Sequence, residues 1–202
     1  MKKTIQFLFD FGSPNAYLCH KTLPALAART DATVEYVPIL LGGLFKLANN
    51  RSPMEVYGEV PNRRAYDMLE IKRFIHKHGI TQFKMNPFFP VNTLHMMRGA
   101  VAAESLGCFA RYVDAMFAAM WEEGRNLNEP AALLAALADA DLDAQALLDR
   151  SQTPEVKAKL MANTQAAFEH GAFGSPTFFV GDEMFFGKDR LGDVELEIQV
   201  AR

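Results

Sequence analysis

The stretch TIQFLFDFGSPNAYL, residues 4–18, decides the fold. Its first part, residues 4–10, mixes β-branched and aromatic residues and therefore predicts a strand. The next part predicts the start of a helix, because Ser13 is a favourable N-cap and Pro14 a favourable first helical residue. A second strand is predicted at residues 33–37. The chain thus opens with a strand, a helix and a strand, an order that favours a right-handed parallel crossover.

A long helical region and a second pair of strands follow this opening. Periodic apolar residues predict helices at 62–78, 93–106, 109–123, 130–139, 141–150 and 154–170. Pro24 is expected to kink or divide the first helix. After Gly171 and Gly174, the segments 176–180 and 183–186 predict a hairpin that turns at Gly181-Asp182 and leads into a final helix at 189–200.

This order of elements predicts an α/β protein with a thioredoxin-like core that is interrupted by a large all-α insertion. We expect residues 1–40 plus 171–202 to form the split thioredoxin-like domain. Residues 41–170 are then expected to form the helical insertion domain.

Composition excludes several classes of function. The chain has 202 residues, of which 50% are hydrophobic, so it can bury a core. A net charge of -3 without a basic block argues against nucleic acid as a partner. No apolar stretch approaches the ~20 residues of a membrane span, and the apolar N-terminal run, interrupted by Asp10, is interpreted as a strand rather than a signal peptide. Two cysteines, Cys19 and Cys108, are too few for a disulfide framework, which favours a reducing compartment such as the cytoplasm.

The first chemical motif is Ser13-Pro14-Asn15-Ala16 at the predicted junction of strand and helix. A helix N-terminus stabilises an anion through its free N–H groups and dipole. In thiol–disulfide enzymes of this architecture a Cys-Pro-x-Cys sequence lies at the junction, and the same field lowers the pKa of the first thiol. Here Ser13 replaces the first cysteine and Ala16 the second. A serine hydroxyl cannot exchange disulfides, but it can donate a hydrogen bond to a thiolate that another molecule supplies; the alternative is an N-cap serine without further role.

A second motif, FGSPT at residues 173–177, precedes a predicted strand. In thioredoxin-like proteins the proline at this place is typically cis, and the residue before it presents its backbone to a bound peptide. An ordinary turn proline is the alternative. The third motif, FFGKDRL at residues 185–191, places Asp189 near a helix start, where it is either an N-cap or a partner for the α-amino group of a γ-glutamyl moiety. No cluster of cysteine, histidine and acidic residues predicts a metal site.

Together these motifs resemble the 2-hydroxychromene-2-carboxylate isomerases, which are relatives of kappa-class glutathione transferases and of DsbA-type oxidoreductases. The resemblance covers nearly the whole chain. It rests on FDFGSPNAYL at 9–18, VPNRRAYDMLEIKR at 60–73, WEEGRNL at 121–127 and FGSPTFFVGDEMFFGKDRL at 173–191.

The resemblance implies glutathione as cofactor and Ser13 as the catalytic residue that holds its sulfur. The residues that it implies around glutathione are Ser13, Lys46, Asn62, Arg63, Ser175, Pro176, Phe186, Gly187, Lys188 and Asp189. The segment 87–93 would approach a small aromatic substrate. Ser175 departs from the aliphatic residue often found before this proline, although a backbone role survives the change. Arg63, on sequence alone, is more readily a solvated residue at a helix start than a ligand.

The implied reaction is a glutathione-dependent cis–trans isomerisation without net redox change. It would convert 2-hydroxychromene-2-carboxylate-type hemiketals to trans-o-hydroxybenzylidenepyruvate-type products, as in naphthalene-type aromatic degradation, and the family resemblance suggests a homodimer. Two alternatives stay open: a kappa-like glutathione transferase, which would consume glutathione, and a non-catalytic DsbA-shaped binding or chaperone module. A thiol–disulfide oxidoreductase is disfavoured because the chain has no Cys-x-x-Cys.

Overall fold

The computed structural model, which describes residues 3–200, is built around a four-stranded sheet with the strand order β2-β1-β3-β4. Strand β1 (Thr4–Phe9) pairs in parallel with β2 (Thr33–Pro38) and antiparallel with β3 (Thr177–Val180), which in turn pairs antiparallel with β4 (Glu183–Phe186). Helix α1 (Pro14–Thr30) connects the parallel pair. The predicted strand–helix–strand opening and the C-terminal hairpin are therefore confirmed.

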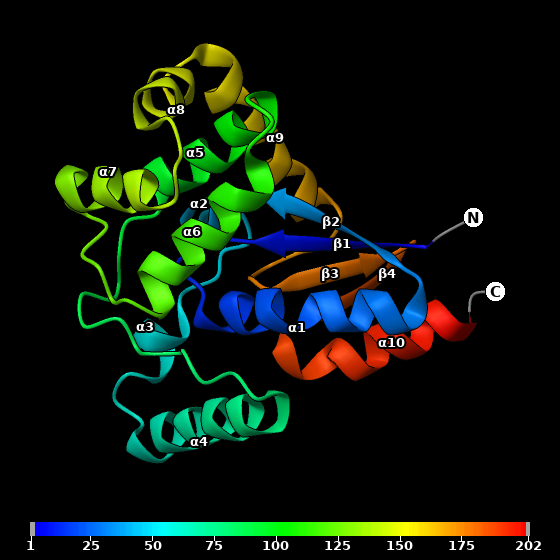
Figure 1. Ribbon diagram of the computed structural model, residues 1–202. Coiled ribbons are helices and arrows are strands. Elements are labelled where there is room, and N and C mark those ends of the chain that lie inside the picture. The colour runs from blue at the N-terminus through cyan, green and yellow to red at the C-terminus, as the bar shows by residue number, and fades with distance from the viewer. Residues whose placement is uncertain (1–2, 201–202) are drawn as a thin grey trace.

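Helices cover both faces of this sheet (Figure 1). One face is covered by α1 and by α10 (Leu191–Val200), which follows the short 3-10 turn η1 (Lys188–Arg190). The other face is covered by α9 (Pro154–Glu169) and α2 (Leu41–Leu47). Because helices lie on both sides, the side chains of β1 are buried alternately in two clusters, with Phe7 and Phe9 in one and Leu8 in the other.

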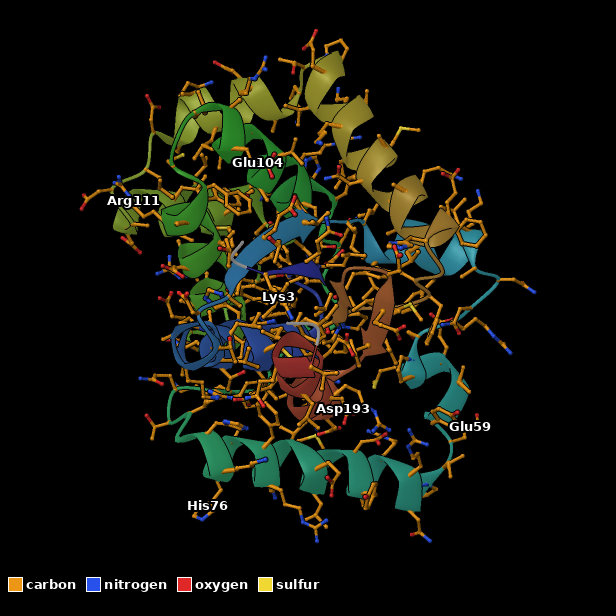
Figure 2. All side chains as sticks on the ribbon, turned by 90° about the vertical axis from the view of Figure 1, so that its right-hand side faces the viewer. Lys3, Glu59, His76, Glu104, Arg111 and Asp193 are labelled. Carbon is orange, nitrogen blue, oxygen red and sulfur yellow. The ribbon has the colours of Figure 1, made fainter. Side chains whose placement is uncertain are left out.

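The region between β2 and β3 is helical, as predicted, and the expected α/β fold with a large helical insertion is confirmed. Its remaining helices are α3 (Pro53–Tyr57), α4 (Pro61–His78), α5 (Leu94–Ser105), α6 (Phe109–Trp121), α7 (Pro130–Asp139) and α8 (Ala144–Ser151). Helix α4 forms an outer layer beyond α1 and α10 in both Figure 1 and Figure 2, with Glu59 just before its start and His76 near its end. None of the described helices is long and apolar enough to cross a membrane.

Two details of the sequence prediction are wrong. Pro24 does not divide the first helix, because it lies on the exposed side of an unbroken α1, where water can bond the carbonyl that proline leaves without a donor. Helix α8 begins at Ala144 rather than at residue 141, because the side chain of Asp143 accepts a hydrogen bond from the Ala146 N–H and so caps the helix there.

The α10 helix provides a test of how much its buried face contributes to stability. Ile198 is 4% exposed and belongs to the main core, whereas Leu196 on the same helix is 58% exposed. We expect Ile198→Ala to lower the free energy of unfolding by about 2–5 kcal/mol, because it leaves a cavity in the core. The matched variant Leu196→Ala should change it by no more than about 0.5 kcal/mol. Urea unfolding of both variants measures this, and equal losses would show that α10 is not anchored as described.

Candidate active site

The loop between β1 and α1 holds Ser13 in a defined position. Ser13 is the N-cap of α1 and is 5% exposed; its Oγ accepts a hydrogen bond from the Ala16 N–H at 3.1 Å. The Ser13 N–H donates to the Asp10 carbonyl oxygen at 3.0 Å. The Ser13 hydroxyl donates in turn to the carbonyl oxygen of Ser175 at 3.0 Å. The first and second sequence motifs are therefore in direct contact.

The third motif reaches the same place through the pairing of β3 with β4. The Ser175–Pro176 peptide bond is cis, as expected for this architecture. The carbonyl oxygen of Pro176 accepts a hydrogen bond from the Gly187 N–H at 3.0 Å, and Gly187 has a φ of 95°, which favours glycine. The ring of Phe186 covers Gly174 so closely that a Cβ there would lie 2.7 Å from Phe186 Cε2.

Asp189 extends from this junction into solvent. Its side chain is 65% exposed, and one carboxylate oxygen is 2.6 Å from Nζ of Lys188, which is itself only 4% exposed. The buried Lys188 ammonium also lies 5.3 Å from the centre of the Phe74 ring, and so connects η1 to α4. Gly187, not Asp189, is the N-cap of η1, so the N-cap interpretation of Asp189 is wrong. An exposed carboxylate beside the cis-proline loop can bind a ligand cation.

The other predicted cofactor residues lie on neighbouring elements. Lys46 is exposed on α2, and Asn62 is exposed in the first turn of α4. Arg63 bonds Asp67 at 2.9 Å, and its guanidinium lies 4.5 Å from the centre of the Tyr57 ring. Within residues 3–200 the structure records no hydrogen bond from these three side chains to Ser13 or to the cis-proline loop, so their roles stay predictions.

Sequence reasoning missed two residues that support the site. Asp10 is fully buried at the end of β1, and its carboxylate accepts hydrogen bonds from Gly12 N–H, Leu41 N–H and the Thr93 hydroxyl. Burial raises the pKa of Asp10, and these three donors oppose that shift. Trp121 is fully buried in the core, and its Nε1–H donates to the Phe11 carbonyl oxygen at 2.8 Å. A charged residue inside the apolar run FLFDF was the available signal for Asp10.

The chain's own sulfur is not placed for chemistry. Cys19 is fully buried in α1, and this burial raises the pKa of its thiol well above the usual value. A buried, protonated thiol is a poor nucleophile. Cys108 is half-buried at the start of α6, and both cysteines are free. Across the described residues, histidine, cysteine and acidic side chains form no group of three that could hold a metal ion.

Asn15, two positions after Ser13, leaves one polar atom unsatisfied. Its Oδ1 is buried and has no hydrogen-bond partner. An unmatched buried acceptor is uncommon in a folded protein. It lies in the first turn of α1, next to the residue that the sequence singled out.

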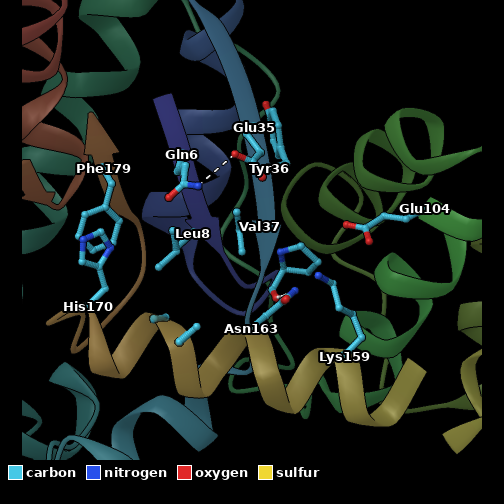
Figure 3. A pocket seen from close by; sticks show the side chains of 13 residues that line it. Gln6, Leu8, Glu35, Tyr36, Val37, Glu104, Lys159, Asn163, His170 and Phe179 are labelled. Atoms are coloured by element: carbon cyan, nitrogen blue, oxygen red, sulfur yellow. Dashed lines mark hydrogen bonds between the residues drawn. The ribbon is translucent and has the colours of Figure 1, made fainter. Parts of the chain in front are cut away.

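A separate cavity of about 330 Å³ lies on the opposite face of the sheet, between the strands and α9 (Figure 3). The residues that line it include Gln6, Leu8, Glu35 and Phe179 from the sheet, Lys159, Asn163 and His170 from α9 or its end, and Glu104 from α5. None of the residues predicted for the site lines this cavity. The junction at Ser13 and the cavity are thus two different places in the fold.

The junction of a helix N-terminus with a cis-proline loop defines the chain as a thioredoxin-fold protein of the DsbA type, and the model of the DSBA-like thioredoxin domain family matches residues 4–199. Within that class the chain belongs to the family of the 2-hydroxychromene-2-carboxylate isomerases. It is 30% identical to the 2-hydroxychromene-2-carboxylate isomerase of Sphingobium xenophagum over 96% of this chain and 97% of the relative.

Two further comparisons agree with this family. A solved structure of a 2-hydroxychromene-2-carboxylate isomerase superposes with a TM-score of 0.83 at 27% identity, covering 98% of this chain and 95% of that one. Glutathione S-transferase kappa 1 of Homo sapiens is 27% identical over 95% of this chain and 88% of the relative. The relatives are therefore enzymes that act on small molecules, and the family includes proteins named for glutathione.

Trp121 provides a test of how the loop before Ser13 is held. We expect Trp121→Phe to lower the free energy of unfolding by about 1–3 kcal/mol, because the buried Phe11 carbonyl loses its donor. The amides of Gly12 and Ser13 should then exchange hydrogen faster. The matched control is Tyr112→Phe, which removes a buried hydroxyl that bonds the Met96 carbonyl oxygen at 2.9 Å. Tyr112→Phe should leave hydrogen exchange at Gly12 and Ser13 unchanged. If Trp121→Phe leaves it unchanged as well, Trp121 does not hold this loop.

Proposed function

We propose that this protein is a glutathione-dependent isomerase that converts 2-hydroxychromene-2-carboxylate-type hemiketals to trans-o-hydroxybenzylidenepyruvate-type products. The observation that carries this proposal is the hydrogen bond between the Ser13 hydroxyl and the cis-proline loop. Because of this contact, Ser13 lies beside the cis-proline loop at a helix N-terminus that favours an anion, a position at which thiol–disulfide enzymes of this architecture have a cysteine. The inert Cys19 thiol argues for a sulfur that a bound molecule brings.

The polar groups around this junction match the chemistry of glutathione. Ser13 and the first turn of α1 would face the thiol, and the backbone of Ser175 would pair with the cysteinyl part. Asp189, exposed and charged, would bind the α-ammonium group of the γ-glutamyl end. Oδ1 of Asn15, buried in the same turn, is not used by another described residue and could accept a hydrogen bond from a ligand.

When bound, glutathione supplies a thiolate that can add reversibly to a conjugated carbon and leave again, so that a double bond can change its geometry without net redox change. The role of Ser13 is to hold that sulfur in its ionised form. A serine hydroxyl has one hydrogen, and Ser13 donates it to the Ser175 carbonyl. Ser13 must therefore turn its O–H from that carbonyl to the sulfur. Together with the field of the helix N-terminus, this bond lowers the pKa of the bound thiol.

Exposed aromatic rings beside the junction support an aromatic substrate. Phe173 and Phe186 pack against each other with ring centres 4.5 Å apart, and both are more than one-third exposed. Phe88, in the segment predicted to approach the substrate, is also exposed. Such rings can stack on a planar substrate.

A kappa-like glutathione transferase is the second candidate, because the human kappa relative matches nearly the whole chain. It would use the same cofactor residues but would consume glutathione. Incubation with ring-fused hemiketal carboxylates and limiting glutathione separates the two: an isomerase turns over many substrates per glutathione, whereas a transferase stops when glutathione is exhausted. Absence of glutathione binding in a calorimetric titration would favour a non-catalytic module instead.

Ser13→Ala tests the working residue. We expect turnover to fall by about tenfold to a hundredfold, because one charge-assisted hydrogen bond worth about 1.5–3 kcal/mol is lost. Glutathione affinity should be largely retained, because the contacts near Pro176 and Asp189 remain. The control is Thr153→Ala, which removes the N-cap hydroxyl of α9. Steady-state kinetics decide the matter, and wild-type turnover in Ser13→Ala would exclude Ser13 as the working residue.

Asp189→Asn tests the γ-glutamyl contact. We expect it to weaken glutathione binding more than it slows saturated turnover, because Asp189 holds a part of the cofactor remote from the sulfur. The variant also leaves the buried Lys188 without its anion, so affinity is measured well below the unfolding temperature. Asp193→Asn, which removes an exposed carboxylate bonded to Arg190 at 3.1 Å, is the control. Unchanged affinity in a calorimetric titration would contradict the assignment.

A further inference from the structure

The carboxylate of Asp10 joins three segments that are far apart in the sequence. Its Oδ1 accepts a hydrogen bond from the Gly12 N–H at 2.8 Å. Its Oδ2 accepts one from the Leu41 N–H at 2.8 Å and another from the Thr93 hydroxyl at 3.0 Å. The loop before Ser13, the first residue of α2 and the residue before α5 therefore share one buried carboxyl group.

Helix α2, which begins at this point, has no side-chain cap of its own, whereas the first N–H of α5, that of Leu94, donates to Oδ1 of Asn92 at 3.1 Å. Leu40 is the N-cap of α2 and offers no side-chain acceptor, and Asp10 takes the Leu41 N–H instead. Thr93 is the N-cap of α5, but its hydroxyl donates to Asp10 rather than accepting from its own helix. Asp10 thus provides α2 with the acceptor that the local sequence lacks, and it also binds the hydroxyl of the residue before α5.

The same contacts confine the residue that precedes Ser13. A Cβ on Gly12 would lie 3.0 Å from Cγ2 of Thr93 and 3.3 Å from Oδ1 of Asp10. The backbone carbonyl of Asp10 also accepts the Ser13 N–H. The side chains of Asp10 and Thr93 therefore pack closely against Gly12, the residue just before Ser13.

We propose that Asp10 is a positioning residue for Ser13: its buried carboxylate binds the Gly12 N–H and so holds the backbone just before Ser13 against the starts of α2 and α5, with the Ser13 hydroxyl aimed at a bound thiolate. This inference rests on the proposed function of Ser13. Asp10 acts through this backbone and does not touch the ligand. The bond from Thr93 to Asp10 also connects the loop before Ser13 to the end of the segment 87–93, which is predicted to approach the substrate.

Asp10→Asn keeps the size of the side chain but removes its charge and one of its two acceptor oxygens. A carboxylate accepts all three donors, whereas an asparagine amide has one oxygen and turns an N–H₂ group towards at least one of them. We expect the backbone at Gly12 to shift, turnover to fall by about tenfold to a hundredfold, and bound glutathione to show less thiolate in its ultraviolet absorbance. Calorimetric affinity for glutathione should change by no more than about threefold, because the remote contacts remain.

The decisive comparison repeats Asp10→Asn in a Ser13→Ala background. If Asp10 acts through Ser13, the second substitution lowers turnover by less than about twofold there, because the interaction it supports is already gone. The matched control is Thr164→Val. Thr164 is also buried, and its hydroxyl accepts from the Leu40 N–H at 2.9 Å beside the same helix start, but it does not contact Gly12 or Ser13. It should lower stability while leaving turnover per folded molecule unchanged.

Thr93→Val keeps the inference testable if Asp10→Asn does not fold. It removes one donor to Asp10 but retains the methyl group that packs on Gly12, so it should reduce turnover and bound thiolate in the same direction by a smaller factor. Two outcomes would overturn the positioning role. In one, Asp10→Asn lowers turnover by the same factor in the wild-type and in the Ser13→Ala backgrounds. In the other, Asp10→Asn leaves turnover unchanged although Ser13→Ala lowers it. If Ser13→Ala itself changes neither turnover nor bound thiolate, the proposed function fails, which is a separate result.

Discussion

The fold of this protein depends on a buried carboxylate at the end of its central strand. Asp10 follows β1, one of the two inner strands of the sheet, and its oxygens satisfy donors from the loop, from α2 and from the residue before α5. Burying a charge is costly unless it is fully hydrogen-bonded. Because these donors meet only when all three segments are in place, the interaction favours one arrangement of the helical insertion on the sheet.

The candidate site is a consequence of the same strand pairing. Antiparallel pairing of β3 with β1 brings the start of β3 beside the end of β1, so the cis-proline loop meets the Ser13 hydroxyl. Pairing of β4 with β3 then brings Gly187 to Pro176 and leaves Asp189 at the rim. Backbone groups brought together by strand pairing, such as the Ser175 and Pro176 carbonyls, thus form much of this polar site.

The chemistry follows from what this site retains and what it lacks. The helix N-terminus still favours an anion, as in redox relatives, but the residue at that position is a serine. The nearby Cys19 is buried and protonated, and so it cannot take over the role of the missing cysteine. A site that stabilises a thiolate without owning one is suited to a thiol cofactor, which connects the fold to the proposed glutathione chemistry.

The sequence by itself determined the order of the strands and of the longer helices, because apolar periods, caps and turn residues act locally, but it did not predict the short helices α2 and α3. It showed that a serine, Ser13, stands where thiol–disulfide enzymes of this architecture have a cysteine. It also indicated that the motifs at 13–16, 173–177 and 185–191 belong together. Only the tertiary structure decided how they meet, that Lys188 is buried against Phe74, and that Asp10 and Trp121 support the loop. It also left Lys46, Asn62 and Arg63 without a recorded bond to Ser13 among the described residues. The physical reason is that hydrogen bonds between distant segments depend on strand register and side-chain direction, which local sequence patterns do not encode.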